Sequence, residues 1–107
     1  MRILFDQGTP VPLRSFLKPH QVLTAYELGW SNWKNGELLA AAEAHGFEVF
    51  VSTDQNLRYQ QNLGARGIGL VILTSTSWPR MKLNIEKIVS AIQSLPRRGY
   101  IEVFIEP

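Results

Sequence analysis

The chain has 107 residues, of which 45% are hydrophobic and 19% charged, and its formal net charge at pH 7 is +2. This length fits one domain over residues 1–107, and the apolar share is large enough for a hydrophobic core, which excludes a disordered chain. The lack of cysteine excludes disulfides, thiolate zinc sites and a cysteine nucleophile. No apolar run approaches the ~20 residues that cross a bilayer, and residues 1–6 are charged too early for a secretory signal, so we expect a cytoplasmic protein without membrane contact.

Strand-like and helix-like patterns alternate along the chain, which is typical of βαβ units with a mostly parallel sheet. Residues 2–5 form a short apolar run that predicts a buried strand. Thr9 and Pro10 then predict the N-cap and the first residue of a helix that reaches about Leu17. A second strand is expected over residues 20–25.

The middle of the chain continues this alternation. Asn35 is expected to cap a helix over residues 36–44, and the apolar run at residues 47–52 predicts a third strand. A short polar helix that reaches about Asn62, followed by a fourth strand over residues 68–73, completes this part of the chain.

The last third of the chain predicts one longer helix and an edge strand. We expect Pro79 to open the helix, whose apolar residues share one face, and Pro96 to end it. Residues 100–106 alternate between apolar and polar side chains, the pattern of a strand with one face partly wet, and this apolar edge favours a homodimer. Together the patterns predict a three-layer α/β/α sandwich with a mostly parallel sheet of about five strands.

Three carboxylates fall where such a sheet gathers its ligands. Asp6 follows the first predicted strand, Asp54 follows the third, and Glu37 lies in the first turn of the helix between them. Ligands of parallel α/β sheets bind beyond the carboxyl ends of the strands, and right-handed crossovers bring that helix start to the same edge. Converging carboxylates repel one another unless a cation lies between them, so these residues predict a Mg²⁺ or Mn²⁺ site, to which Asn56 adds an oxygen or a positioned water.

Each carboxylate also has a structural interpretation. Aspartate is common in turns and at helix N-caps, which fits both Asp6 and Asp54, and the helix dipole favours Glu37 in a first turn. If the cation is bound, it can activate water and neutralise a phosphodiester during an in-line displacement. Metal-dependent cleavage of a nucleic acid is therefore the chemistry that the cluster predicts.

Polar and aromatic residues around the same loops are candidates for substrate binding. Trp30 and Trp33 lie in one loop, where aromatic rings can stack on unpaired bases or pack against the sheet or a partner protein. For the cationic side chains, the alternative to phosphate binding is an ordinary solvated surface charge. The predicted substrate-binding residues are Lys34, Asn35, Arg58, Thr74 and Arg80.

Three stretches, residues 3–10, 35–39 and 51–57, resemble the small compact branch of the PIN-like proteins. They correspond to an opening D-x-G-x-P, an acidic helix start and a turn of the type T-x-D-x-[DN], and the resemblance covers roughly residues 2–75 in the right order. It implies an α/β/α sandwich and metal-dependent cleavage of RNA, and many relatives are toxins that pair with an antitoxin protein. By this resemblance Asp6 and Asp54 match the first and third metal carboxylates, and Glu37 falls at, or two residues past, the second.

Two departures from the family pattern motivate an alternative. Asn35 and Asn56 stand where these relatives often have aspartate, and each exchange removes a negative charge, which lowers the expected affinity for a metal. The alternative function is an RNA-binding or partner-binding protein on a PIN-like scaffold with weakened chemistry.

A phosphoacceptor receiver domain is the third hypothesis. Receivers also place aspartates after the first and third strands and a threonine after the fourth, where Thr74 stands in this chain. The first strand here ends in one aspartate instead of an acidic pair, and no lysine closes the fifth strand, which counts against this hypothesis.

Overall fold

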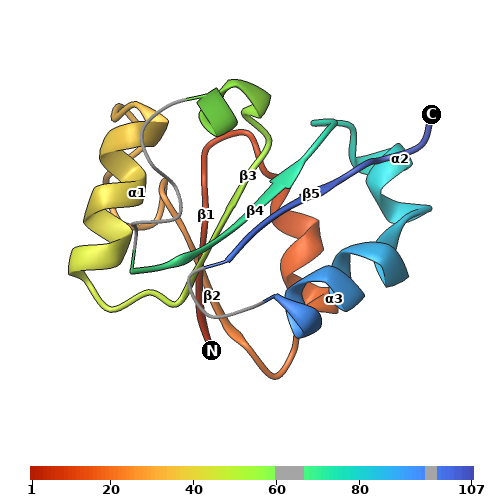
Figure 1. Ribbon diagram of the computed structural model, residues 1–107, viewed down its shortest axis with the longest axis horizontal. Coiled ribbons are helices and arrows are strands. Elements are labelled where there is room, and N and C mark those ends of the chain that lie inside the picture. The colour runs from red at the N-terminus through yellow and green to blue at the C-terminus, as the bar shows by residue number, and fades with distance from the viewer. Residues whose placement is uncertain (60–66, 96–98) are drawn as a thin grey trace.

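The computed structural model describes residues 1–59, 67–95 and 99–107, and within these ranges it contains one five-stranded sheet (Figure 1). The strand order is β2-β1-β3-β4-β5, and every neighbouring pair is parallel. The predicted mostly parallel sheet is thus confirmed, with β5 as an edge strand. The strands are β1 (Arg2–Phe5), β2 (Gln21–Thr24), β3 (Val49–Ser52), β4 (Gly69–Leu73) and β5 (Tyr100–Val103).

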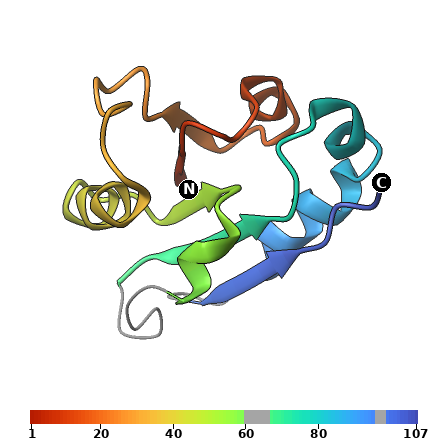
Figure 2. The ribbon, with the colours of Figure 1, turned by 90° about the horizontal axis from the view of Figure 1, so that it is seen from above.

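Helices cover both faces of the sheet, as Figure 2 shows from above. One face packs against α1 (Asn35–Ala44) and the 3₁₀-helix η2 (Gln55–Tyr59), and the other against the 3₁₀-helix η1 (Val11–Phe16), α2 (Trp78–Lys82) and α3 (Ile85–Ser94). Side chains alternate between the two faces of a strand. Because the central strands are apolar on both faces, they supply two separate cores. This arrangement confirms the three-layer α/β/α sandwich.

The two cores divide neighbouring residues of the same strand. Ile3 and Phe5 of β1 contribute to the core under η1 and α3, whereas Leu4 contributes to the core under α1. All three side chains are fully buried. The short apolar run at the start of the chain is therefore a central strand with helices on either side.

The sheet has a topological switch point between β1 and β3. From β1 the chain moves outward to β2, and then crosses back over β1 to form β3 on the other side. In open α/β sheets the crevice at such a point, beyond the carboxyl ends of the strands, is where ligands bind. Asp6 and residues 53–54 directly follow the two strands that flank it.

The predicted helix starts need correction at two residues. Pro10, and not Thr9, occupies the N-cap position of η1, which is a 3₁₀-helix, because the Thr9 hydroxyl donates to Asp6 instead. Lys34 occupies the N-cap position of α1, and Asn35 is already its first helical residue. In both places the predicted capping side chain donates to an aspartate instead, Thr9 to Asp6 and Asn35 to Asp54.

The longer helix expected to begin at Pro79 is two helices, α2 and α3, joined at Leu83 and Asn84. The side-chain amide of Asn84 donates to the carbonyl of Arg80 at 2.7 Å, while the backbone N–H of Asn84 turns to the carbonyl of Met81. An asparagine side chain that replaces the backbone donor in this way interrupts a helix. The predicted stop at Pro96 and the end of the polar helix near Asn62 lie outside the described residues.

No helix in residues 1–59, 67–95 and 99–107 combines the length and the apolar character that crossing a bilayer requires.

Candidate functional site

Asp6 is a buried carboxylate with two hydrogen bonds at each oxygen. Its side chain is only 3% exposed. Oδ1 accepts from the Gly8 N–H at 3.2 Å and from the Thr9 hydroxyl at 2.6 Å. Oδ2 accepts from the Ser52 hydroxyl at 2.6 Å and from the Thr53 N–H at 3.3 Å. Four donors fill the acceptor capacity of the carboxylate, so Asp6 ties the turn after β1 to the end of β3.

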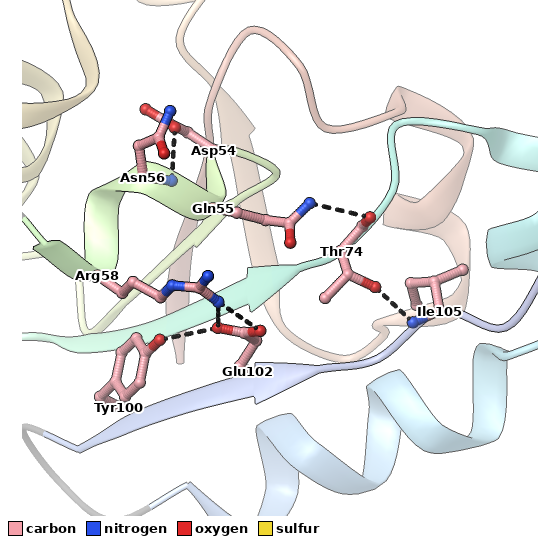
Figure 3. Close-up of polar contacts among 8 residues, drawn as sticks. All are labelled: Asp54, Gln55, Asn56, Arg58, Thr74, Tyr100, Glu102 and Ile105. Carbon is pink, nitrogen blue, oxygen red and sulfur yellow. Dashed lines mark hydrogen bonds and ion pairs between the residues drawn. The ribbon is translucent and has the colours of Figure 1, made fainter.

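Ser52 connects Asp6 to Asp54. While its hydroxyl donates to Asp6, its oxygen also accepts from the Asp54 N–H at 3.0 Å, and the Ser52 side chain is fully buried. The Asp54 carboxylate in turn accepts from the Asn56 N–H at 3.0 Å, a local turn contact that Figure 3 shows. The two aspartates are thus joined through one hydroxyl, at the carboxyl ends of adjacent strands.

Asn35 brings the start of α1 to the same place. Its side-chain amide donates to Oδ2 of Asp54 at 3.2 Å. This contact fixes the orientation of the amide, because the opposite orientation would place two acceptors against each other. The remaining oxygen, Oδ1 of Asn35, is buried and has no hydrogen-bond partner in the part of the chain that the structure describes.

Glu37 is held at the helix start. Its carboxylate accepts from the backbone N–H of Lys34 at 3.0 Å, which is one half of a capping box. Within residues 1–59, 67–95 and 99–107, no three histidine, aspartate or glutamate side chains lie close enough together to hold a metal ion. The structure therefore brings Asp6, Asp54 and Asn35 together, and it gives Glu37 a partner of its own.

Arg58, expected at the substrate, is engaged by β5 (Figure 3). Its guanidinium donates to both carboxylate oxygens of Glu102 at 2.9 Å and lies over the ring of Tyr59. Hydrogen bonding from Arg58 lowers the pKa of Glu102, and the same contact raises the pKa of Arg58. Burial, followed by the hydrogen bond to Glu102, raises the pKa of Tyr100. Arg58 therefore ties η2 to the edge strand.

Thr74, also expected at the substrate, connects the ends of β4 and β5. Its hydroxyl oxygen accepts from the Ile105 N–H at 2.7 Å, and its carbonyl accepts from the Gln55 side chain at 3.2 Å (Figure 3). The two other predicted cationic contacts, Lys34 and Arg80, are exposed next to the starts of α1 and α2. Of the predicted substrate residues, Asn35 contacts Asp54, and Lys34 directly precedes Asn35 in the sequence.

Sequence reasoning missed Ser52, which carries the contact between the two aspartates. A signal was present, since Ser52 is the one polar residue in the strand that contains Val49 and Val51. A buried hydroxyl needs a hydrogen-bond partner, and a nearby carboxylate at the strand end supplies it.

Comparisons with protein-family models, with curated proteins and with solved structures give no match. The same strand order occurs in doubly wound proteins of unrelated function, so the fold alone does not choose among the functional hypotheses. The choice rests on the residues around the switch point.

Proposed function

We propose that the protein is a Mg²⁺- or Mn²⁺-dependent ribonuclease whose site lies at the switch point between β1 and β3. The observation that carries this proposal is the Asn35 side-chain oxygen, buried without a hydrogen-bond partner among the described residues and attached to the amide that contacts Asp54. An unsatisfied buried oxygen is costly unless something fills it, and amide and carboxylate oxygens are ligands of hard divalent cations. The resemblance of the three motifs to PIN-like proteins supports the same activity.

Asp54 and Asn35 would hold the cation, with Asn56 and Glu37 as further oxygen donors from the adjoining turn and helix start. Glu37 would join them by giving up its hydrogen bond from Lys34. A bound cation would supply a Lewis acid and a water of lowered pKa. Asp6 adds negative charge and, through Ser52, holds the Asp54 backbone in place.

The substrate in this proposal is single-stranded RNA. Lys34 directly precedes Asn35 in the sequence and is exposed, so its ammonium can contact a phosphate of RNA bound at the site. Arg80 and Thr74 would contact phosphates further along the strand, and Arg58 would do so in exchange for Glu102. The resemblance also leads us to propose an antitoxin protein as a partner. We further propose a cytoplasmic location and a homodimer through the edge strand β5.

A second candidate function is an RNA-binding or partner-binding protein without hydrolysis. It is favoured by the four hydrogen bonds at Asp6, because a cation that bound this carboxylate would displace a donor. It is also favoured by Asn35 and Asn56, which leave fewer charges to attract a divalent ion.

Cleavage of a labelled single-stranded RNA with added Mn²⁺ tests the proposed activity. We expect the Asp54→Asn chain to lose at least about 100-fold in rate, since the exchange removes the charge of the main proposed ligand. Glu48→Gln is the matched control, because it also converts a carboxylate to an amide but lies at the amino ends of the strands, where Glu48 accepts from Arg2. A chelator should abolish cleavage by the wild type and by the control.

A calorimetric titration of the protein with Mn²⁺ alone separates the two candidate functions. Mn²⁺ binding that is weakened in both Asp54→Asn and Asn35→Ala supports the ribonuclease. If the wild type neither cleaves RNA nor binds Mn²⁺, the ribonuclease proposal is wrong. RNA binding that persists unchanged in Asp54→Asn would then support the second candidate.

A further inference from the structure

The loop between β2 and α1 carries two indole rings in a parallel stack. The ring centroids of Trp30 and Trp33 are 5.3 Å apart, and the ring planes differ by 9°. Trp30 also meets the edge of the His45 ring at 4.9 Å and packs against the core under α1. The inner ring is therefore fixed by the fold, and the outer ring is held against it.

Trp33, the outer ring, faces solvent although tryptophan is the largest apolar side chain. It is 40% exposed. The residues on either side of it, Asn32 and Lys34, are polar and exposed as well. Trp33 thus offers a flat, partly exposed ring between two polar neighbours in the chain, whereas a protein-binding surface would have an apolar centre of several side chains.

Gln7 ties the backbone of this loop to the switch point. Its side-chain amide donates to the carbonyls of Ser31 at 3.0 Å and of Trp33 at 2.7 Å. Gln7 directly follows Asp6, and Trp33 comes two residues before Asn35, which contacts Asp54. Two residues of extended chain reach at most ~7 Å, so the backbone of Trp33 lies within about one nucleotide's length of the backbone of Asn35.

We propose that Trp33 is a stacking platform for one unpaired nucleobase of the RNA, next to the phosphate held at the switch point. Aromatic stacking suits single strands because every base has a flat face, and a ring already held in place loses little conformational entropy when it binds. Lys34 supplies the neighbouring positive charge. This inference rests on the proposed function, because it takes RNA as the substrate.

The test measures the affinity of a labelled oligouridine in the presence of a chelator, so that cleavage plays no part. We expect Trp33→Leu to weaken binding roughly 5- to 150-fold, the loss typical of one stacked base, and Trp33→Phe to weaken it less. Phe104→Leu is the matched control, since Phe104 is another exposed aromatic residue but lies beyond the edge strand β5. An abasic oligonucleotide of the same length should bind the wild type and Trp33→Leu equally.

Failure of this inference is distinguishable from failure of the proposed function. If the wild type cleaves RNA with Mn²⁺ but Trp33→Leu binds oligouridine as tightly as the wild type, stacking by Trp33 is wrong and the ribonuclease stands. If the wild type binds no oligouridine and cleaves no RNA with Mn²⁺, both proposals are wrong. An unchanged affinity together with a changed oligomeric state of Trp33→Leu would assign the ring to a protein interface and overturn the stacking role.

Discussion

The sheet has two halves, the β1 and β3 side and the β4 and β5 side, which use polar residues in different ways. On the β4 and β5 side, Arg58 and Tyr100 both donate to Glu102, and the Thr74 hydroxyl accepts from Ile105 (Figure 3). On the β1 and β3 side, a series of hydrogen bonds runs from buried Asp6 through Ser52 and Asp54 to Asn35. This series of hydrogen bonds ends at Oδ1 of Asn35, which has no hydrogen-bond partner among the described residues.

The difference shows which polar residues the fold uses for its own support. The ion pair of Arg58 and Glu102 is partly exposed, so water and salt screen it and it contributes little to stability. Asp6 is buried, and its charge is tolerated only because four donors compensate for the lost water. The series of hydrogen bonds that begins at Asp6 ends at Asn35, and a ligand there would supply the missing partner of Oδ1 of Asn35.

The largest effect should come from Asp6→Ala. Truncation leaves the hydroxyls of Thr9 and Ser52 and two backbone N–H groups without their acceptor in a buried site. We expect the free energy of unfolding, measured with urea, to fall by about 3–5 kcal/mol, because bonds to a charged group contribute about 1.5–3 kcal/mol each and are not additive.

Asp6→Asn is the matched variant for this prediction. It keeps the shape and two acceptor sites, and it should lose less stability than Asp6→Ala. If Asp6→Ala unfolds at the same urea concentration as the wild type, the buried carboxylate does not hold β1 and β3 together. The two halves of the sheet would then not differ in their use of polar residues.

The next effect concerns the close approach of the turns after β1 and β3. A Cβ built at Gly8 would overlap the side-chain oxygen of Thr53. Gly8→Ala should therefore destabilise the protein by about 1–3 kcal/mol, the usual range for overpacking.

A double-mutant cycle that combines Gly8→Ala with Thr53→Ala measures the contact between the added methyl group and the Thr53 oxygen. Removal of the Thr53 oxygen makes room for the added methyl group, so the double variant should recover part of the loss. Strictly additive losses in the urea midpoints would show that the two turns are not packed against each other.

Much of the fold was predictable because apolar runs and turn residues act locally. The strand at residues 2–5 is confirmed, and the strand expected at residues 68–73 differs by one residue from β4, since buried central strands are apolar throughout. The division into α2 and α3 was not predictable from helical periodicity. It depends on one side-chain hydrogen bond of Asn84 that competes with the backbone.

The candidate site was predictable in place and less so in detail. The rule for parallel sheets located Asp6 and Asp54 at one edge, and the structure joins them through Ser52. The partners of each carboxylate depend on contacts between residues far apart in the chain, such as Asn35 with Asp54. No local pattern encodes those distances, and the metal, the RNA and the antitoxin stay predictions.

A smaller effect is expected from Asn35→Asp, which places a second carboxylate beside Asp54. Without a divalent ion, the new charge beside Asp54 should lower the melting temperature, because like charges repel. With Mn²⁺, the affinity should rise about tenfold over the wild type, since ligand charge sets the strength of such sites. Calorimetric titration and thermal unfolding with and without Mn²⁺ measure both changes.

Asn32→Asp is the control for the added charge. Asn32 is exposed in the loop before α1, so its exchange should change neither the melting temperature nor the Mn²⁺ affinity by much. Equal responses of the two variants to Mn²⁺ would mean that position 35 has no special relation to a cation, and the proposed ligand set would be wrong.

The smallest effect should come from the β4 and β5 half of the sheet. The Arg58 guanidinium lowers the pKa of Glu102, so this carboxylate stabilises the folded state above its unfolded pKa, near 4.5, and the contribution is lost as pH falls through the folded pKa. Tyr100 has a raised pKa, chiefly from burial, so its contribution is present below about pH 10 and lost as pH rises further.

Glu102→Gln tests the acid side of this behaviour. The variant should be slightly less stable than the wild type at neutral pH and low salt, and the difference should shrink in acid and at high salt, because both remove the charge interaction. Glu106→Gln is the control, since Glu106 is 71% exposed and lies 3.9 Å from Lys87. A loss in Glu102→Gln that salt and acid leave unchanged would mean that Glu102 supports β5 by packing, and the contrast with the buried charge of Asp6 would weaken.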